Sequence, residues 1–190
     1  MTLLKLDSQH AWFESIRKHP SPHCDARPLG TEIELIVVHG ISLPPGEFGG
    51  HFIEDLFTGT LDENIHPFFK EIAQLRVSAH LLIRRDGEVI QYVSLQQRAW
   101  HAGISSFQGR TQCNDFSIGI ELEGCDDVPY TELQYQQLAR IITTLQQTWS
   151  NLTQERIVGH SDIAPERKTD PGHAFDWHYL YQLLAFQKNG

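Results

Sequence analysis

The feature that most constrains the fold is an apolar run rich in β-branched residues, Ile33-Glu34-Leu35-Ile36-Val37-Val38. Such a run is typical of a strand covered on both faces, and therefore of a sheet packed between other layers. His39 follows the run directly, so the sequence predicts an imidazole where this strand ends. The next segment, 43–50, contains two prolines and three glycines, and we expect it to form a long surface loop beside His39.

The rest of the chain alternates strand and helix patterns. Asp86-Gly87 between two apolar runs predicts a hairpin of strands at 78–83 and 88–93. Residues 116–123 alternate so that Glu121 points away from the apolar face. Thr131 and Gln134 form a capping-box pattern that opens a helix. Further helices are expected at 8–16, 53–57, 65–75 and 176–184. We therefore predict one α/β domain over residues 1–190, with a central mixed sheet and helices packed on its faces; residues 1–30 form a peripheral helix and an irregular lead-in.

A second strand-to-loop junction places ligand-capable side chains together. Residues 156–158 are typical of a short buried strand, and two prolines keep much of 159–172 out of helical space. His160 follows this strand and Asp170 lies further along the loop. If the two strands are neighbours, His39 and His160 open on the same edge of the sheet with Asp170 above them. A catalytic zinc takes three protein ligands of these types. For each histidine alone, a hydrogen-bonded structural role is the alternative.

Two further side chains suit acid–base chemistry. Glu121 lies beside Gly119, which leaves space above the sheet, so its carboxylate can accept a proton from an attacking water. Lys168 stands two residues from Asp170 and projects to the same side of an extended segment, where an ammonium group can stabilise an oxyanion. The alternatives are a solvated carboxylate for Glu121 and a weak surface ion pair for Lys168.

Three residues are candidates for holding a ligand: Arg76, His80 and Trp100. An arginine ahead of a strand can fork onto a ligand carboxylate, and an exposed indole suits the apolar face of a sugar. Each of the three can equally be structural. Cys24 and Cys113 lack a recognisable nucleophile context.

Charge and composition exclude other classes of function. A net charge of -9 argues against non-specific binding to nucleic acid or anionic lipid, because both require a concentrated basic face. The three cysteines are scattered, which favours a reducing cytosol over a disulfide framework. No apolar stretch has the length of a signal-peptide core or a membrane span. We expect a cytoplasmic protein with no nucleic-acid, membrane or obligate protein partner.

Several runs closely resemble the AmpD family, the bacterial cytosolic 1,6-anhydro-N-acetylmuramyl-L-alanine amidases. They are residues 37–39, 41–50, 76–80, 98–103, 113–124 and 163–172. The likeness extends over nearly the whole chain, from 21 to 177, and more distantly to phage-type amidases and peptidoglycan recognition proteins.

The resemblance implies one zinc ion held by His39, His160 and Asp170, with Glu121 and Lys168 as the catalytic pair. It also implies the substrate, an anhydromuramyl peptide from cell-wall turnover that is cut between the lactyl group and L-alanine. In bacteria with an inducible β-lactamase, such an enzyme removes the inducing muropeptides.

The chain departs from the family pattern at two places. Gly40 stands where the family has an asparagine that can bind substrate, and Thr111-Gln112 replace part of a basic stretch, which can shift the preference toward intact muramyl sugar. Two alternatives to the amidase remain. One is a muropeptide-binding module that does not cleave. The other is a structural zinc site, which requires a fourth protein ligand; within the loop only His173 is available for it.

Overall fold

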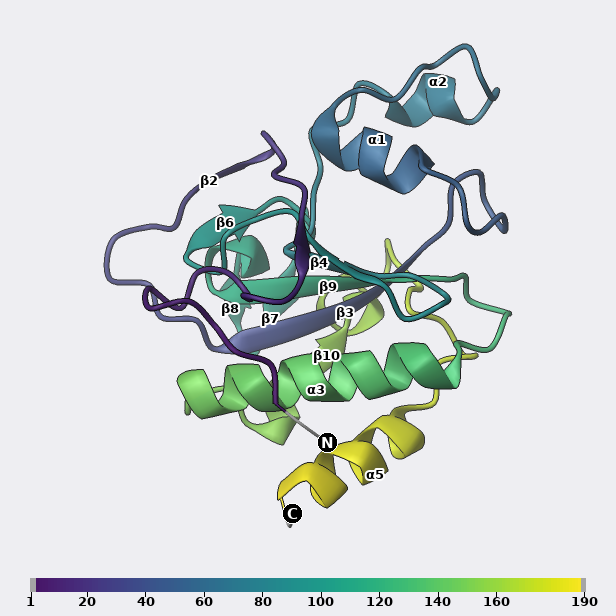
Figure 1. The fold of residues 1–190 in the computed structure, drawn as a ribbon. Helices are drawn as coiled ribbons and strands as arrows, with labels where there is room; N and C mark the ends of the chain where they lie inside the picture. Colours follow the sequence, from purple (N-terminus) through teal and green to yellow (C-terminus); the bar gives the residue numbers. More distant parts are fainter. Residues whose placement is uncertain (1–2, 189–190) are drawn as a thin grey trace.

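The apolar run that begins at Ile33 leads into β3 (Leu35–Ile41), an inner strand of a six-stranded sheet. The computed structural model describes residues 3–188 (Figure 1). The strand order is β1 (Arg17–Lys18), β5 (Val89–Gln91), β4 (Leu81–Ile83), β9 (Ser117–Glu123), β3 and β10 (Ile157–Gly159). Only β4 and β5 pair antiparallel, as the predicted hairpin, and the other neighbours are parallel. The predicted mixed sheet of an α/β domain is confirmed.

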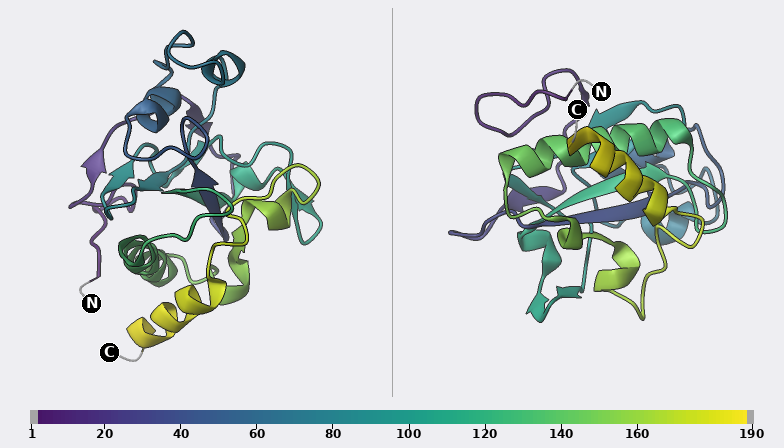
Figure 2. Two further views of the ribbon diagram at one scale, coloured as in Figure 1. Left: turned by 90° about the vertical axis from the view of Figure 1, so that its right-hand side faces the viewer. Right: turned by 90° about the horizontal axis from the view of Figure 1, so that it is seen from below.

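The two faces of the sheet are covered by different layers. Ile36 and Ile118 belong to the main core, which joins the sheet to α3 (Glu132–Thr148) and α5 (Trp177–Lys188). Figure 1 shows both helices on one side of the sheet, and Figure 2 shows α5 against α3. Leu35 and Val37 alternate with these residues and pack in another cluster on the opposite face. Odd-numbered residues of β3 and β9, which include His39 and Glu121, therefore face away from α3.

The long helix begins as its sequence pattern predicts. The Thr131 hydroxyl accepts a hydrogen bond from the Gln134 N–H at 3.2 Å, and the Gln134 side chain accepts one from the Thr131 N–H at 3.0 Å. Gln134 is fully buried and its amide also donates to the carbonyls of Ile83 and Glu123. The cap thus connects α3 to the ends of β4 and β9. The final helix also begins as predicted, with the Asp176 carboxylate accepting from Tyr179 N–H at 2.8 Å.

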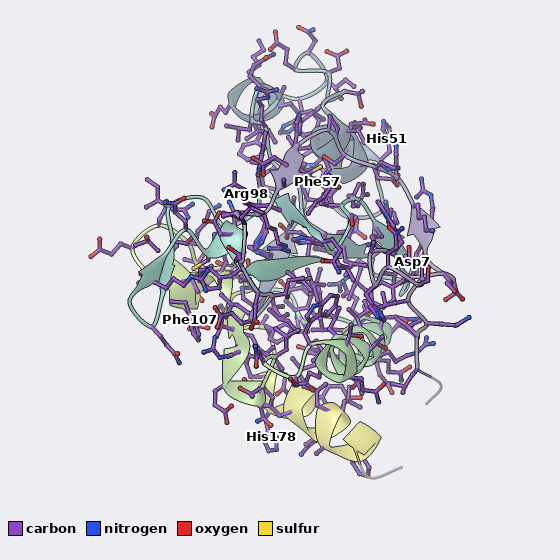
Figure 3. The ribbon with its side chains drawn as sticks, turned by 90° about the vertical axis from the view of Figure 1, so that its left-hand side faces the viewer. Asp7, His51, Phe57, Arg98, Phe107 and His178 are labelled. Atoms are coloured by element: carbon purple, nitrogen blue, oxygen red, sulfur yellow. The ribbon has the colours of Figure 1, made fainter. Side chains whose placement is uncertain are left out.

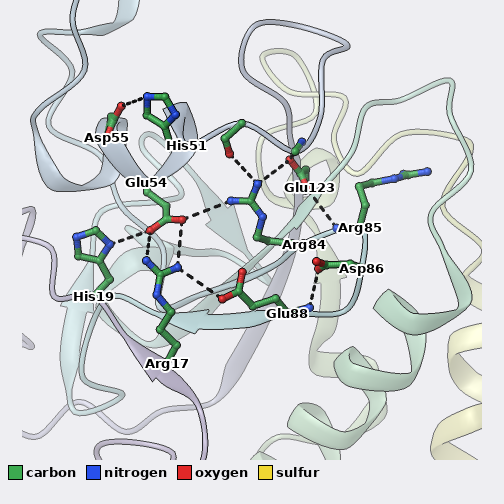
Figure 4. A network of polar contacts seen from close by, with 12 residues as sticks. Arg17, His19, His51, Glu54, Asp55, Arg84, Arg85, Asp86, Glu88 and Glu123 are labelled. Atoms are coloured by element: carbon green, nitrogen blue, oxygen red, sulfur yellow. Dashed lines mark hydrogen bonds and ion pairs between the residues drawn. The ribbon is translucent and has the colours of Figure 1, made fainter.

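Two short helices lie on the opposite side of the sheet from α3 (Figure 1). In α1 (Phe52–Thr58), Phe57 packs edge-on against Tyr92, with ring centroids 5.1 Å apart, and points toward the sheet (Figure 3). α1 is also fixed by Glu54, whose carboxylate accepts from Arg17 at 2.7 Å and pairs with His19 at 2.9 Å (Figure 4). The predicted helix at 65–75 is a single turn, α2 (Phe69–Ile72), because 62–68 form consecutive turns ahead of it.

The predicted N-terminal helix at 8–16 is wrong. The segment folds back on itself, with a bridge between Leu6 and Phe13 and the Asp7 carboxylate accepting from Ala11 N–H at 2.8 Å. Phe13 is fully buried in the main core. Burial of this one side chain and the local turn at Asp7 outweigh the weak helical spacing.

The remaining elements are small. They are β2 (Cys24–Ala26), β6 (Gln97–Ala99), β7 (Ser106–Phe107), β8 (Arg110–Thr111), the 3₁₀ turns η1 (Cys113–Asp115) and η2 (Gln154–Arg156), and α4 (His160–Ile163). The predicted loop at 43–50 contains no helix or strand. Within residues 3–188, no helix combines the length and apolar character needed to cross a bilayer.

Candidate metal centre and catalytic site

The structure brings the three predicted metal ligands together. Nδ1 of His39 lies 2.9 Å from Nδ1 of His160 and 3.2 Å from Oδ2 of Asp170, and the last two atoms are 3.1 Å apart. Among residues 3–188, they form the group of side chains that could hold a metal ion. A tetrahedral ion with bonds of about 2.0–2.1 Å separates its ligand atoms by roughly 3.3 Å. Two ring nitrogens and a carboxylate oxygen at these separations are the donor set and spacing that a zinc ion requires.

The elements that carry the ligands explain their convergence. β10 pairs parallel with β3, as the site prediction required. However, His39 does not end its strand: β3 continues to Ile41, and the His39 side chain lies on the sheet face away from α3. The site therefore sits on a face and not on an edge of the sheet. His160 opens α4, so the predicted loop begins with one helical turn.

Asp170 is fixed by the segment that follows it. The Tyr130 hydroxyl donates to the carbonyl of Pro171 at 2.9 Å, and the Tyr130 ring lies against Gly40 and Gly124 at the ends of β3 and β9. Burial alone raises the pKa of the Asp170 carboxyl, but its contacts with His160 and His39 outweigh the burial and hold that pKa below its usual range. Asp170 is thus an anion that faces two imidazoles.

Glu121 stands next to this cluster and is buried. It pairs with His39 in the register of β9 and β3, so both side chains project from the same face. Its Oε1 lies 4.0 Å from His39 Nδ1, and its buried Oε2 has no hydrogen-bond partner. Burial, and then the charge of Asp170, raise the pKa of the Glu121 carboxyl well above its usual value. The solvated carboxylate considered as its alternative is therefore excluded.

A cavity of about 650 Å³ opens onto these groups. Lys168 and Asp170 both line it, in agreement with the prediction that they project to one side. Its far wall is apolar and is formed by residues of the 43–50 loop, of α1 and of the segment around α2: Leu43, Leu56, Phe57, Phe68 and Ile72. The site thus combines a polar cluster at the sheet with an apolar wall opposite, as small-molecule sites commonly do.

The structure places the three candidate ligand-holding residues in different surroundings. Trp100 lines the cavity, and its indole donates to Asp25 at 3.2 Å. Arg76 is exposed and is not among the residues that line the cavity, but its guanidinium carbon lies 5.9 Å from the Trp100 ring centre. His80 is fully buried and accepts from the Gly119 N–H at 3.0 Å, so it cannot touch a bound ligand. Its structural alternative is the correct one.

His173 does not complete a closed site of four ligands. Its ring is exposed and lies 3.6 Å from the carboxylate of Asp127, outside the cluster of His39, His160 and Asp170. The cysteines are free, and burial raises the pKa of the Cys24 and Cys113 thiols, which opposes a nucleophilic role.

Three residues that contact the site are not among those predicted from the sequence. His101 lies 2.9 Å from the outer nitrogen of His39, Arg167 donates to the carbonyl of Ala102 at 2.6 Å, and Tyr130 holds Pro171. Arg167 has a sequence signal, because it directly precedes Lys168 in the site loop. His101 and Tyr130 have none, since their roles depend on spaces left by glycines on other strands.

An α/β fold that presents two histidines and a carboxylate beside a buried glutamate has the parts of a metal-assisted hydrolase. Comparison with known sequences makes this specific. The chain belongs to the N-acetylmuramoyl-L-alanine amidase family, which it matches over residues 29–173.

Individual relatives are similar over almost their whole length. The 1,6-anhydro-N-acetylmuramyl-L-alanine amidase AmpD of Escherichia coli (strain K12) is 60% identical over 177 residues, which cover 93% of this chain and 96% of that protein. AmpD of Salmonella typhimurium (strain SL1344) is 58% identical, over 94% and 95%.

Solved structures agree. The crystal structure of a selenomethionine derivative of AmpD has a TM-score of 0.92 at 57% identity, over 95% of this chain and 99% of that one. A complex of E. coli AmiD with the substrate anhydro-N-acetylmuramic acid-L-Ala-D-gamma-Glu-L-Lys has a TM-score of 0.59 at 31% identity, over 83% and 60%.

Proposed function

We propose that this protein hydrolyses the amide between the lactyl group of 1,6-anhydro-N-acetylmuramic acid and L-alanine, with one zinc ion held by His39, His160 and Asp170. The observation that carries the proposal is the convergence of these three ligand atoms, within 3.2 Å of one another, beside the unpartnered Oε2 of buried Glu121. Family membership gives the bond that is cut.

The chemistry that zinc supplies when bound is Lewis-acid activation of an amide carbonyl and of an attacking water. The protein supplies the proton transfers and the positioning. Glu121, whose Oε1 lies 4.0 Å from His39 Nδ1, accepts the proton of the attacking water. Lys168 in the same cavity stabilises the negative charge that develops on the carbonyl oxygen. As the carbon–nitrogen bond breaks, the Glu121 carboxyl returns the proton to the alanine nitrogen. The lactyl carboxylic acid that forms then loses its remaining proton to the released amine, so the products are a lactyl carboxylate and a peptide with a protonated amino group.

The substrate class rests on the relatives and on the shape of the site. AmpD proteins are named for the 1,6-anhydro sugar, and the apolar wall opposite the cluster suits a carbohydrate ring with few exposed hydroxyls. Trp100 in the cavity wall and the exposed Arg76 beside it are proposed to hold the ligand. A 1,6-anhydro ring closes the reducing end of a sugar, so such a substrate is a fragment already cut from a glycan strand. We place the reaction in the recycling of these fragments in the bacterial cytoplasm, and the free cysteines agree with a reducing compartment.

The test is product release, measured by mass spectrometry, from an anhydromuramyl tripeptide and from its intact-muramyl counterpart. Zinc-loaded and chelator-treated protein are compared. We expect zinc-dependent release of free tripeptide. Glu121→Gln should lower kcat by about 10²- to 10⁴-fold, and Lys168→Ala by about 10²- to 10³-fold, both with one zinc still bound.

Glu63→Gln and Lys5→Ala are the matched controls, because they make the same changes at exposed positions away from the cavity. Near-normal turnover by both site variants with zinc bound would show that the assigned roles are wrong. Tight binding of the tripeptide without cleavage in any condition would identify a muropeptide-binding module instead.

A further inference from the structure

The imidazole of His101 occupies a slot in the sheet that exists because residue 119 has no side chain. A Cβ at Gly119 would lie 2.6 Å from His101 Nδ1 and 2.7 Å from its Cδ2, closer than real Cβ atoms come to other atoms. Both ring nitrogens have partners: Nδ1 lies 2.9 Å from Nε2 of His39, and Nε2 lies 3.0 Å from the Ser117 hydroxyl. The ring therefore joins β9 to the outer side of a metal-binding histidine.

A metal at the site determines which ring nitrogens carry protons in the hydrogen-bonded series of His39, His101 and Ser117. Nδ1 of His39 faces His160 and Asp170, and a ring nitrogen that binds a metal carries no proton. The proton of neutral His39 is then on Nε2, which donates to Nδ1 of His101. His101 in turn carries its proton on Nε2 and donates it to Ser117. The hydrogen bonds of this series are thus all donated in one direction, from His39 to His101 and from His101 to Ser117.

The residue after His101 orients the second histidine ligand. Nε2 of His160 lies 3.2 Å from the carbonyl oxygen of Ala102, so its Nδ1 is directed at the metal in the same way. The backbone of this pair is held by the Asn114 side chain, whose oxygen accepts from the N–H groups of His101 at 3.1 Å and Ala102 at 2.8 Å. Two consecutive residues thus support both imidazoles of the site.

We propose that His101 is a positioning residue of the metal centre: lodged over Gly119, it holds His39 with Nδ1 toward the metal, and the segment 101–102 is the common support of both histidine ligands. This inference rests on the zinc site proposed above. Partners of this kind fix the tautomer and ring orientation of ligating histidines. A carboxylate or backbone carbonyl usually plays this part, whereas here it is another imidazole.

The first test needs only the native protein. In the zinc-loaded chain, two-dimensional NMR that correlates imidazole nitrogens with ring protons reports which nitrogen carries the proton. We expect His101 to be neutral with its proton on Nε2 and a bare Nδ1, and His39 to be protonated on Nε2. A proton on Nδ1 of His101 would overturn the proposal, because that nitrogen could then accept nothing from His39.

The second test uses variants and measures zinc affinity by competition with a chelator. His101→Leu keeps much of the ring's volume but offers no acceptor, and we expect it to weaken zinc binding about 10- to 100-fold. His101→Asn can place a carbonyl oxygen near the position of Nδ1 and should recover most of the affinity. Gly119→Ala keeps His101 but fills its slot, so it should weaken zinc binding as well.

Unfolding of the metal-free variants by urea separates positioning from packing. If His101→Leu and His101→Asn lower the stability of the metal-free protein equally but only the first loses zinc affinity, the acceptor and not the bulk of the ring is what matters. If both bind zinc as tightly as the native chain, His101 only fills space and the inference fails while the zinc site stands. If the native chain itself binds no zinc, the proposed function fails and the positioning role fails with it.

Should His101→Leu not fold, Ser117→Ala keeps the inference testable. It removes the partner of His101 Nε2 without touching either ring, and we expect a smaller but measurable loss of zinc affinity. The proposal would be contradicted if Ser117→Ala bound zinc with unchanged affinity and NMR of the native protein placed the proton of His101 on Nδ1.

Discussion

A methyl group at Gly40 should destabilise the protein through a single atom, the hydroxyl oxygen of Tyr130. A Cβ at position 40 would lie well within 3.0 Å of that oxygen, whereas the next nearest atoms, Cα of Pro171 and Cζ of Tyr130, are both at 3.5 Å, an ordinary contact distance. The backbone is not an obstacle, because Gly40 is not among the residues with positive φ. We expect Gly40→Ala to cost about 1–3 kcal/mol, as overpacking in a tight interior does.

Tyr130→Phe removes the clashing atom and has a cost of its own. The hydroxyl donates to the carbonyl of Pro171, and loss of the donor leaves a buried acceptor unpaired, which costs about 1–3 kcal/mol. In the Phe background an alanine at 40 meets nothing closer than 3.5 Å. The double variant should therefore be about as stable as Tyr130→Phe alone, with Gly40→Ala nearly neutral in that background.

Urea unfolding of the four metal-free proteins, followed by far-UV circular dichroism, measures this coupling. Gly50→Ala is the matched control, because a Cβ there meets only Phe52, at 3.4 Å and beyond, and its effect should be the same in both backgrounds. If the costs of Gly40→Ala and Tyr130→Phe add to within about 0.5 kcal/mol, the two groups are independent. That result would refute the reasoning.

Three further predictions address the cap, acid stability and the metal. Thr131→Ala should lower the free energy of unfolding by about 1 kcal/mol through loss of the helix cap, measured by urea unfolding. Burial alone raises the pKa of Glu54, but Arg17 and His19 outweigh it and lower that pKa. Its contribution to stability is therefore present above the ordinary glutamate pKa of about 4.3 and is lost as the pH falls below it. The stability difference between the native protein and Glu54→Gln should accordingly shrink as the pH falls below about 4.3. Free zinc at about 1,000 times its dissociation constant should add about 4 kcal/mol to stability, and His160→Ala should abolish this dependence in a thermal melt.

The sequence predicted those parts of the fold whose patterns are local and strong. The Asp86-Gly87 hairpin, the capping box at Thr131 and the apolar run of β3 each specify their element through a few neighbouring residues, and all three are confirmed. The N-terminal segment was mispredicted because its conformation depends on Phe13, which is buried in a core made by distant strands. Local spacing carries no information about that burial.

The candidate site, too, could be predicted only in part from the sequence. The cluster of the three proposed ligands could be predicted because His39 and His160 follow apolar runs and Asp170 lies on a constrained loop. Their place on a face of the sheet was not predicted, since an apolar run does not show that a strand continues beyond its last apolar residue. β3 extends through His39 to Ile41 by pairing with β9. The register that results sets His39 beside Glu121, and this pairing brings the carboxylate to the metal ligands.

The residues that pack behind the site fit into spaces that exist because glycines on the strands have no side chains. His101 fits over Gly119, and Tyr130 fits against Gly40 and Gly124. A glycine in a strand pattern shows that space is available, as the sequence indicated at Gly119, but it does not say which distant ring fills that space. The His101 ring reaches His39, and Tyr130 contacts the residue after Asp170. In the arrangement we propose, the glycines of β3 and β9 therefore help to orient two of the metal ligands. Methyl groups at Gly40 and Gly119 should therefore both weaken zinc binding, although neither position contributes an atom to the metal.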